Sequence, residues 1–294
     1  MNYKQSKRKI LLITFIVAIL VLPVVPVGAK KTSIPSSITV ERISSKITRF
    51  EENILLDIPG LTPPDAYYRA SVYAVKVEGG IVLIDSGDEA LAKDLYEAVT
   101  GTLSQPIVAI YLTHYHADHA GGGSYFQSMD IPVYSPMAEA WAIQLGANVQ
   151  SGIPDAFTYP GYTPDEFYEN IELERGFEIK PASGHTFGAV HIKFTKGNKN
   201  YLFTTDTILP MASEDQTPLD FTSILSIQTA HQNYVYKDAG PIDLWTTQLN
   251  TLYGMMSDIG SYEMVLTGHT PILDSENSMG YLGYTISILE SFAP

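Results

Sequence analysis

The chain has 294 residues, of which 45% are hydrophobic and none is cysteine, and its formal net charge is −14 at pH 7. This length is enough for one large domain or two fused halves, and the lack of cysteine excludes disulfides, thiolate ligands and a lipidated cysteine anchor. Because an acidic protein repels phosphate backbones, nucleic acid is a poor candidate for its substrate.

Residues 1–29 are expected to form a secretory signal peptide. Four basic residues precede an apolar run from Ile10 to Leu22, and the small residues of Val27-Gly28-Ala29 suit a cleavage site. The alternative is an uncleaved membrane anchor, but the run reaches the length of a spanning helix only if Pro23 and Pro26 are included. The leader therefore predicts an exported protein with no membrane contact after cleavage.

The rest of the chain is expected to be a short tether, residues 30–37, and one domain, residues 38–294. Removal of the leader takes away four basic residues and no acidic ones, so the formal net charge would change from −14 to −18. We interpret this charge as favouring solubility outside the cell.

The first half of the domain has the pattern of strands around one helix. Alternating or apolar runs predict strands over residues 38–47, 50–58, 71–77, 81–85 and 107–112, with a hairpin at Glu78-Gly79-Gly80. Between the last two strands, residues 89–100 have helical spacing, and Gly101 is expected to end that helix. Strand, helix and strand form a βαβ unit, which implies parallel pairing.

The second half repeats this alternation after an irregular region. Residues 137–146 are expected to be helical, and residues 151–168, rich in proline, glycine and aromatics, to form a long loop. A second hairpin is expected from residues 189–195 and 201–205, followed by a helix over 242–256, a strand over 263–266 and a helix over 278–292. The pattern alone indicates an α/β or α+β fold.

A cluster of metal-ligand types follows the strand at 107–112. The run from Thr113 to Gly122 reads THYHADHAGG, with three imidazoles and one carboxylate within six residues. His114 and His116 are two apart and face the same way in extended backbone, and the glycines let the chain bend close to the ligands. Such donors suit a catalytic zinc site with an open position. The alternative, surface or capping histidines, is disfavoured because the chain has only seven histidines.

This run, His-x-His-x-Asp-His with trailing glycines, resembles the metallo-β-lactamase fold superfamily. Three later segments resemble further blocks of that family: Ser183–Gly188 (SGHTFG), Leu202–Thr207 (LFTTDT) and Val265–Pro271 (VLTGHTP). Leu83-Ile84-Asp85-Ser86-Gly87 resembles a fifth block. The family usually has glycine where Thr205 stands. The blocks occur in the family's order and span most of the domain, so the resemblance implies an αββα four-layer sandwich with metals between the sheets.

The resemblance also implies a ligand set. His114, His116 and His185 would hold one metal, Asp118, His119 and His269 the other, and Asp206 would bridge them. The cofactors would be two divalent ions, zinc above all, although iron and manganese accept the same donors. Asp85 would brace the site from behind its ligands; alternatively it is a turn or helix-cap residue.

The implied chemistry is hydrolysis. Two ions about 3.5–4 Å apart lower the pKa of a shared water and polarise a carbonyl or phosphoryl oxygen, so that hydroxide attacks the substrate. Asp118 would take the proton in transit. His116 stands where the redox branch of the family has glutamate, and Asp206 where true β-lactamases generally lack a bridging aspartate. The first feature favours hydrolysis, and the second favours the lactonase, thioesterase and phosphodiesterase branches. Export, the acidic charge and the aromatic loop then favour an ester, lactone or related bond of a small molecule. The alternatives are a β-lactamase, a phosphodiesterase and a non-catalytic metal-binding accessory protein.

Several other residues have two interpretations. Phe157, Tyr159 and Tyr162 would form a pocket wall or pack the long loop onto the core, and His231 would bind substrate or be a plain loop residue. Tyr115 would point away from the metals. His191 is expected to be a solvent-facing or hydrogen-bonded strand residue. The sequence predicts no oligomeric state.

Overall fold

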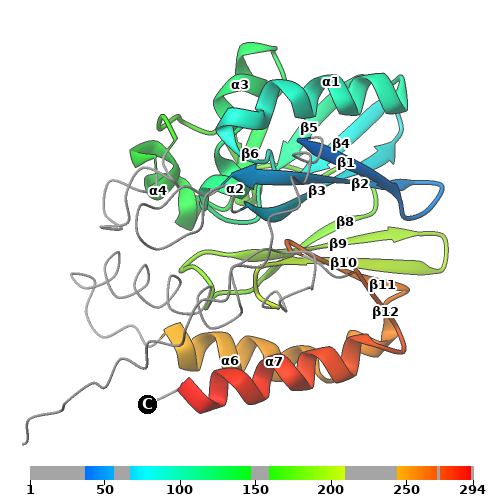
Figure 1. The fold of residues 1–294 in the computed structure, drawn as a ribbon, viewed down its shortest axis with the longest axis vertical. Helices are drawn as coiled ribbons and strands as arrows, with labels where there is room; N and C mark the ends of the chain where they lie inside the picture. The colour runs from blue at the N-terminus through cyan, green and yellow to red at the C-terminus, as the bar shows by residue number, and fades with distance from the viewer. Residues whose placement is uncertain (1–36, 56–66, 147–158, 209–243, 270–271, 293–294) are drawn as a thin grey trace, which may run out of the picture. The chain divides into compact units, whose positions relative to one another are not determined.

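The computed structural model describes residues 37–55, 67–146, 159–208, 244–269 and 272–292. Within these ranges the chain forms two β-sheets that lie between two layers of helices (Figure 1). None of the helices in these ranges has the length and apolar character needed to cross a bilayer. The expected leader, nearly all of the tether, Phe157 and His231 lie outside the described residues.

The N-terminal sheet has seven strands, in the order β1-β2-β3-β4-β5-β6-β7. Their bounds are β1 Ile38–Arg42, β2 Ile47–Leu55, β3 Tyr67–Val77, β4 Gly80–Ile84, β5 Ile107–Tyr111, β6 Val133–Ser135 and β7 Glu166–Phe167. Its helices are the α-helices α1 Ala92–Leu103, α2 Ala117–Ala120, α3 Gly123–Ser128 and α4 Ala140–Leu145, with the 3-10 turns η1 Glu89–Leu91, η2 Met137–Glu139 and η3 Tyr168–Asn170.

The C-terminal sheet has five strands, in the order β12-β11-β10-β9-β8. Its elements are β8 Phe177–Pro181, β9 Val190–Lys196, β10 Lys199–Thr205, α6 Leu244–Met255, η4 Ile259–Ser261, β11 Met264–Thr267, β12 Ile272–Asp274 and α7 Ser278–Phe292. Helices α6 and α7 run side by side along the outer face of this sheet, opposite the side that faces the N-terminal sheet (Figure 1).

Alternation along the strands explains the four layers. In β4, Val82 and Ile84 join a core cluster between the two sheets, whereas Ile81 and Leu83 join a second cluster under α1, α3 and α4. In β10, Phe203 points into the core between the sheets and its neighbour Leu202 into a third cluster under α6 and α7. Because both faces of each sheet are covered, these strands are apolar on both sides. The αββα sandwich expected from the sequence is confirmed.

The βαβ unit is also confirmed, because β4 and β5 pair in parallel across α1. The expected end of the helix at Gly101 is wrong: α1 continues to Leu103 and stops at Ser104, which adopts φ 51°. Such a left-handed residue after the last helical turn is a common helix end, and Pro106 stands two residues further on. Gly101 is simply tolerated on the surface of the last turn, where a Cβ would meet nothing within 4 Å.

The site residues gather where parallel strands end. β10 and β11 are a second parallel pair, so four strands have their carboxyl ends at the same side of the sandwich. Asp85 follows β4, the THYHADHAGG run follows β5, Asp206 follows β10 and His269 follows β11. Ligand sites in α/β proteins lie at the carboxyl ends of strands.

Candidate metal centre

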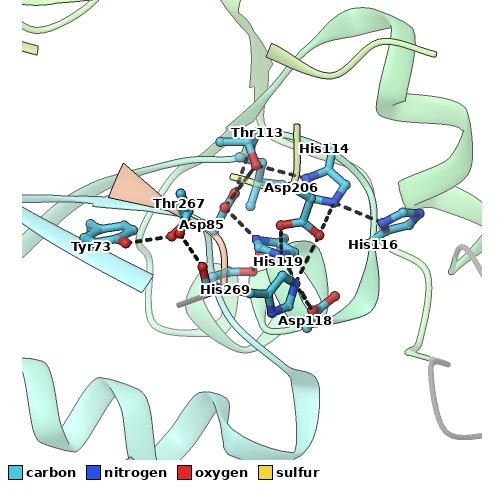
Figure 2. A network of polar contacts seen from close by, with 12 residues as sticks. Tyr73, Asp85, Thr113, His114, His116, Asp118, His119, Asp206, Thr267 and His269 are labelled. Atoms are coloured by element: carbon cyan, nitrogen blue, oxygen red, sulfur yellow. Dashed lines mark hydrogen bonds and ion pairs between the residues drawn. The ribbon is translucent and has the colours of Figure 1, made fainter. Parts of the chain in front are cut away.

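Seven histidine and aspartate side chains converge between the ends of the two sheets. The three-histidine group comprises His114, His116, His185 and Asp206, and the two-histidine group comprises Asp118, His119, His269 and Asp206; within each group the donor atoms lie within 4.8 Å of one another. Figure 2 shows the Asp206 carboxylate between His114 and His119. The structure thus brings together every residue that the sequence analysis assigned as a metal ligand.

In the three-histidine group, three ring nitrogens face one another. His116 Nδ1 lies 3.1 Å from His114 Nε2 and 2.8 Å from His185 Nε2. Asp206 Oδ2 lies 3.4 Å from His185 Nε2 and 3.8 Å from His114 Nε2. Four donor atoms therefore surround one small space, and three of them are imidazole nitrogens, which carry a free lone pair when the ring is neutral.

The two-histidine group faces both oxygens of the same carboxylate. Asp206 Oδ1 lies 3.1 Å from His119 Nε2, while Asp206 Oδ2 lies 3.1 Å from His269 Nε2. Asp118 Oδ2 lies 3.6 Å from His119 Nε2 and 3.5 Å from His269 Nε2. Asp206 is thus the one residue shared by the two groups.

Hydrogen bonds behind the ligands fix which ring nitrogen faces the site. Asp85 Oδ2 lies 2.8 Å from His119 Nδ1, and a carboxylate can only accept there, so His119 Nδ1 donates and Nε2 presents its lone pair. Thr113 Oγ1 lies within 3.0 Å of both Asp85 oxygens and 3.1 Å from His114 Nδ1. Since the hydroxyl donates to Asp85, it accepts from His114. His269 Nδ1 donates to the carbonyl of Arg69. The Asp85 carboxylate thus contacts both His119 and Thr113 from behind the donor atoms.

The electrostatics of the site call for a cation. Although burial opposes a charged imidazolium, the carboxylates of Asp206, Asp118 and Asp85 raise the pKa of His119 well above its ordinary value. Against the same burial, Asp206 raises the pKa of His269 to about 9. Burial and the neighbouring charge of His119 instead lower the pKa of His114 well below its ordinary value, so its imidazole is neutral, as a ligand must be.

Metal ions fit this donor set better than protons do. His119 Nε2 and Asp206 Oδ1 are buried without a hydrogen-bond partner among the described residues, and two such lone pairs are stable 3.1 Å apart only with a cation between them. A proton between these two atoms would also satisfy both lone pairs. In the three-histidine group, however, a proton on one ring nitrogen cannot bond to two others at once, whereas one divalent ion accepts several lone pairs.

Two backbone features bring Asp206 into place. Gly268 lies so close that a Cβ at this position would stand 2.1 Å from Asp206 Oδ1 and 2.9 Å from His119 Cε1. Thr205 has φ 42°, a left-handed conformation that is unfavourable for a β-branched residue. This conformation explains why glycine suits the position. The chain reverses there, directly before the shared ligand.

The trailing glycines of the first cluster act differently from the expectation. Gly122 packs against the loop after β4, not against the donors: a Cβ there would stand 2.3 Å from the carbonyl oxygen of Ser86. Its N–H donates to the carbonyl of Gly87, and the N–H of Ser86 donates to the carbonyl of His119. The glycine therefore lets α2, with Asp118 and His119, lie directly against the loop that carries Asp85.

The aromatic candidates of the long loop pack onto the core. Tyr159 and Tyr162 are 5% and 9% exposed and belong to the cluster under α1 and α3. Their hydroxyls donate to the carbonyls of Tyr115 and Ala120. The structure therefore places both residues as supports for the ligand loop, and it does not place them in a pocket wall. Tyr115, itself part of the ligand loop, has its side chain buried in the same cluster.

His191 is not solvent-facing. It is 4% exposed, and burial, with Lys180 nearby, lowers its pKa to about 3. Its Nε2 has no hydrogen-bond partner among the described residues. Its alternation with Val190 and Ile192 is that of a strand, as expected, but α6 and α7 cover the outer face of this sheet, and strand periodicity alone does not reveal that cover.

The comparisons with known proteins agree with this geometry. Residues 68–238, more than half of the chain, match the family model of the metallo-beta-lactamase superfamily. No curated protein sequence matches the chain. The chain belongs to the metallo-beta-lactamase superfamily, and the resemblance found in the sequence is confirmed.

Solved structures give the same fold at low sequence identity. A metallo-beta-lactamase from Pontibacter korlensis is similar with a TM-score of 0.61 and 18% identity, over 86% of this chain and 99% of that one. The metallo-beta-lactamase FIM-1 from Pseudomonas aeruginosa, in its mono-zinc form, gives 0.61 and 13%, over 89% and 98%. A metallo-beta-lactamase from Hirschia baltica gives 0.58 and 16%, over 86% and 98%. At these identities the likeness extends to the fold alone.

Sequence reasoning missed Thr113 and Gly268, which both lie against the donor groups. Thr113 links Asp85 to His114, and it is the first residue of the run that was recognised; a hydroxyl next to a buried ligand could have been noticed. Gly268 precedes His269 in the last block, where its close approach to Asp206 has no local sequence signal.

Proposed function

We propose that the protein is a dinuclear metal-dependent hydrolase that cleaves an ester, a lactone or a related bond of a small molecule. The observation that carries this proposal is the convergence of two donor groups on Asp206, because a shared carboxylate suits two ions in one site. The superfamily consists mostly of metal-dependent hydrolases.

The donor types indicate which ions to expect. Imidazole and carboxylate suit zinc, which is the first expectation, and also iron or manganese. Two divalent ions, when bound, polarise a carbonyl oxygen and lower the pKa of water. His114, His116, His185 and Asp206 would hold one ion, and Asp118, His119, His269 and Asp206 the other. Of these seven residues, only His116 and His269 are partly exposed, and the other five are buried, so a substrate would enter beside these two histidines.

The chain's own residues divide the remaining work. Asp118, which is 7% exposed, would accept a proton from the water whose oxygen bonds to the carbonyl carbon, on the carboxylate oxygen that does not hold the ion. When the carbon–oxygen bond of the ester breaks, Asp118 would pass this proton to the leaving oxygen, so that atoms and charge balance. Asp85 and Thr113 would keep His119 and His114 in the tautomers that face the site.

The first experiment is the metal content of the mature protein together with hydrolysis of a homoserine lactone, nitrocefin, an aryl ester and a bis-aryl phosphodiester. About two ions per chain and a preference for the lactone or the ester would support the proposal. A preference for nitrocefin or the phosphodiester would instead favour a β-lactamase or a phosphodiesterase. Two ions without turnover would favour the accessory protein. One ion or none would contradict the ligand assignment.

Export is part of the proposal and has its own test. The leader pattern of residues 1–29 supports export, and the lack of cysteine places no demand on the redox state of the destination. N-terminal sequencing of the protein recovered outside the cytoplasm should begin near residue 30. A full-length chain that stays with the membrane fraction would favour the anchor.

A further inference from the structure

Glu139 is a buried carboxylate that belongs to neither donor group. It ends the 3-10 turn η2, directly before α4, and is 1% exposed. Burial raises its pKa to about 7, although the N–H of Gly188, the hydroxyl of Thr186 and the N–H of Tyr115 each oppose that rise. Burying a carboxyl group costs free energy unless hydrogen bonds satisfy its oxygens, so the partners of Glu139 indicate what the residue does.

Its partners lie on two ligand loops. Oε2 accepts the N–H of Tyr115 at 3.0 Å, and Tyr115 stands between the ligands His114 and His116. Oε1 accepts the hydroxyl of Thr186 at 3.0 Å and also the N–H of Gly188. Thr186 directly follows the ligand His185. One carboxylate therefore joins the loop after β5 to the loop before β9.

The Glu139 carboxylate is tightly packed on both sides. A Cβ on Gly188 would stand 2.5 Å from the Ala138 Cβ and 2.8 Å from Glu139 Oε1, so the second loop lies directly on η2. On the other side, the Tyr159 hydroxyl donates to the carbonyl of Tyr115 at 2.8 Å. The backbone N–H and the backbone carbonyl of Tyr115 thus both form hydrogen bonds with buried side chains.

We propose that Glu139 is a positioning residue for the three-histidine group: its carboxylate sets the distance between the loop that carries His116 and the loop that carries His185. This inference rests on the proposed metal centre. It also gives a reason for Thr186 and Gly188 in the SGHTFG block, since both serve as donors to Glu139 and neither is a ligand. Residues that hold ligands in place typically change metal affinity by about 10–100-fold when they are lost.

Glu139→Gln is the variant that tests the role with the least change of shape. An amide has one acceptor oxygen and one donor nitrogen, so in either orientation the nitrogen faces at least one N–H donor of the two loops. We expect titration of the metal-free mature protein with Zn²⁺, in competition with a chromophoric chelator, to show one site weakened about 10–100-fold and the other unchanged. His185→Ala and His269→Ala identify which site is which.

Asp165→Asn is the matched control. Asp165 is also a carboxylate that accepts a backbone N–H, from Val133 at 2.8 Å, and it accepts Gln127 Nε2 at 2.9 Å, but it holds no ligand loop. Both affinities should stay at the wild-type values in this variant. A Glu139→Gln protein with two unchanged affinities, or with both sites weakened equally, would overturn the inference. A wild-type protein that binds no metal would instead refute the proposed function.

A smaller change covers the case in which Glu139→Gln does not fold. Thr186→Val keeps the shape of a fully buried side chain and removes only the hydroxyl that Glu139 accepts. The Zn²⁺ affinity of its three-histidine site should fall about three-fold, which is less than the 10-fold minimum expected for Glu139→Gln. The Zn²⁺ affinity of the other site should be unchanged. Unchanged affinity at the three-histidine site would again overturn the inference.

Discussion

The two halves of the candidate site are built in different ways. The N-terminal sheet delivers His114, His116, Asp118 and His119 in one turn after a single strand, β5. The C-terminal half delivers His185, Asp206 and His269 from three separate places in the chain. The donors of the first half are close in the sequence, so the sequence alone shows them together. The donors of the second half come together only when the C-terminal sheet has formed. The shared ligand, Asp206, belongs to the dispersed half.

Loss of Asp206 should therefore have the largest effect. Asp206→Ala removes a donor from both groups and should lower both metal affinities and turnover by more than the roughly 10–100-fold that loss of an outer partner costs. Metal content and kcat/KM measure this. Asp274→Ala, which removes an exposed carboxylate from β12 in the same sheet, is the control. Two tightly bound ions in Asp206→Ala would contradict the shared role.

Gly268→Ala should come next, because it disturbs the same ligand without removing it. The new Cβ would stand 2.1 Å from Asp206 Oδ1, so the carboxylate has to move. We expect metal affinity in the two-histidine group to fall about 10–100-fold. Gly260→Ala, where a Cβ meets nothing within 4 Å, should bind metal like the wild type. Equal affinities in the two variants would show that Asp206 tolerates displacement.

Adjacent threonines allow a sharper test of the dispersed half. Thr204 and Thr205 are both almost fully buried, but only Thr205 has a positive φ, of 42°. Glycine relieves a left-handed conformation that costs an L-residue about 1–2 kcal/mol, so Thr205→Gly should be less destabilising than Thr204→Gly by about that amount. Denaturant unfolding of the metal-free proteins measures the difference. Equal losses would mean that Thr205 is not strained.

The smallest effect is expected in the loop that supports the local half. Burial raises the pKa of Asp88 from 3.8 to about 6. Because the folded protein holds this proton more tightly than the unfolded chain, its contribution to stability is present at low pH and is lost as the pH rises from about 4 to about 6. Asp88→Asn can still cap Ala90 N–H and should remove this loss. The change in pKa alone corresponds to about 3 kcal/mol. Because Asp88 is only half-buried and solvent screens its charge, we expect about 1 kcal/mol.

The measurement is the free energy of unfolding of the metal-free protein at pH 4 and pH 7. The wild type should lose more stability over this interval than Asp88→Asn does. Glu172→Gln, which changes an exposed carboxylate outside this loop, should follow the wild type. If Asp88→Asn and the wild type had the same pH dependence, Asp88 would not be the group that titrates.

The difference between the halves also explains what the sequence could predict. Periodicity predicted β4, α1 and β5 because apolar alternation is local, and the cluster after β5 showed its chemistry within six residues. His185, Asp206 and His269 could be assigned only through the order of the family's blocks. Glu139 was missed because it is a single glutamate on a helical stretch, and its role depends on two loops that lie 24 and 47 or more residues away. The burial of His191 depends on helices far along the chain.

Bound metal would also stabilise the fold of this chain. The two sheets are joined at the site end by backbone hydrogen bonds, from Ser71 to Gly268 and from Val190 to Thr113. Each donor group also takes ligands from both sheets, so each bound ion would cross-link them. In a cysteine-free chain, the ions would then replace disulfides as clasps. At free metal a thousand times the dissociation constant, one ion adds about 4 kcal/mol. A chelator would weaken the fold as well as the chemistry, and scarcity of metal would shorten the protein's lifetime.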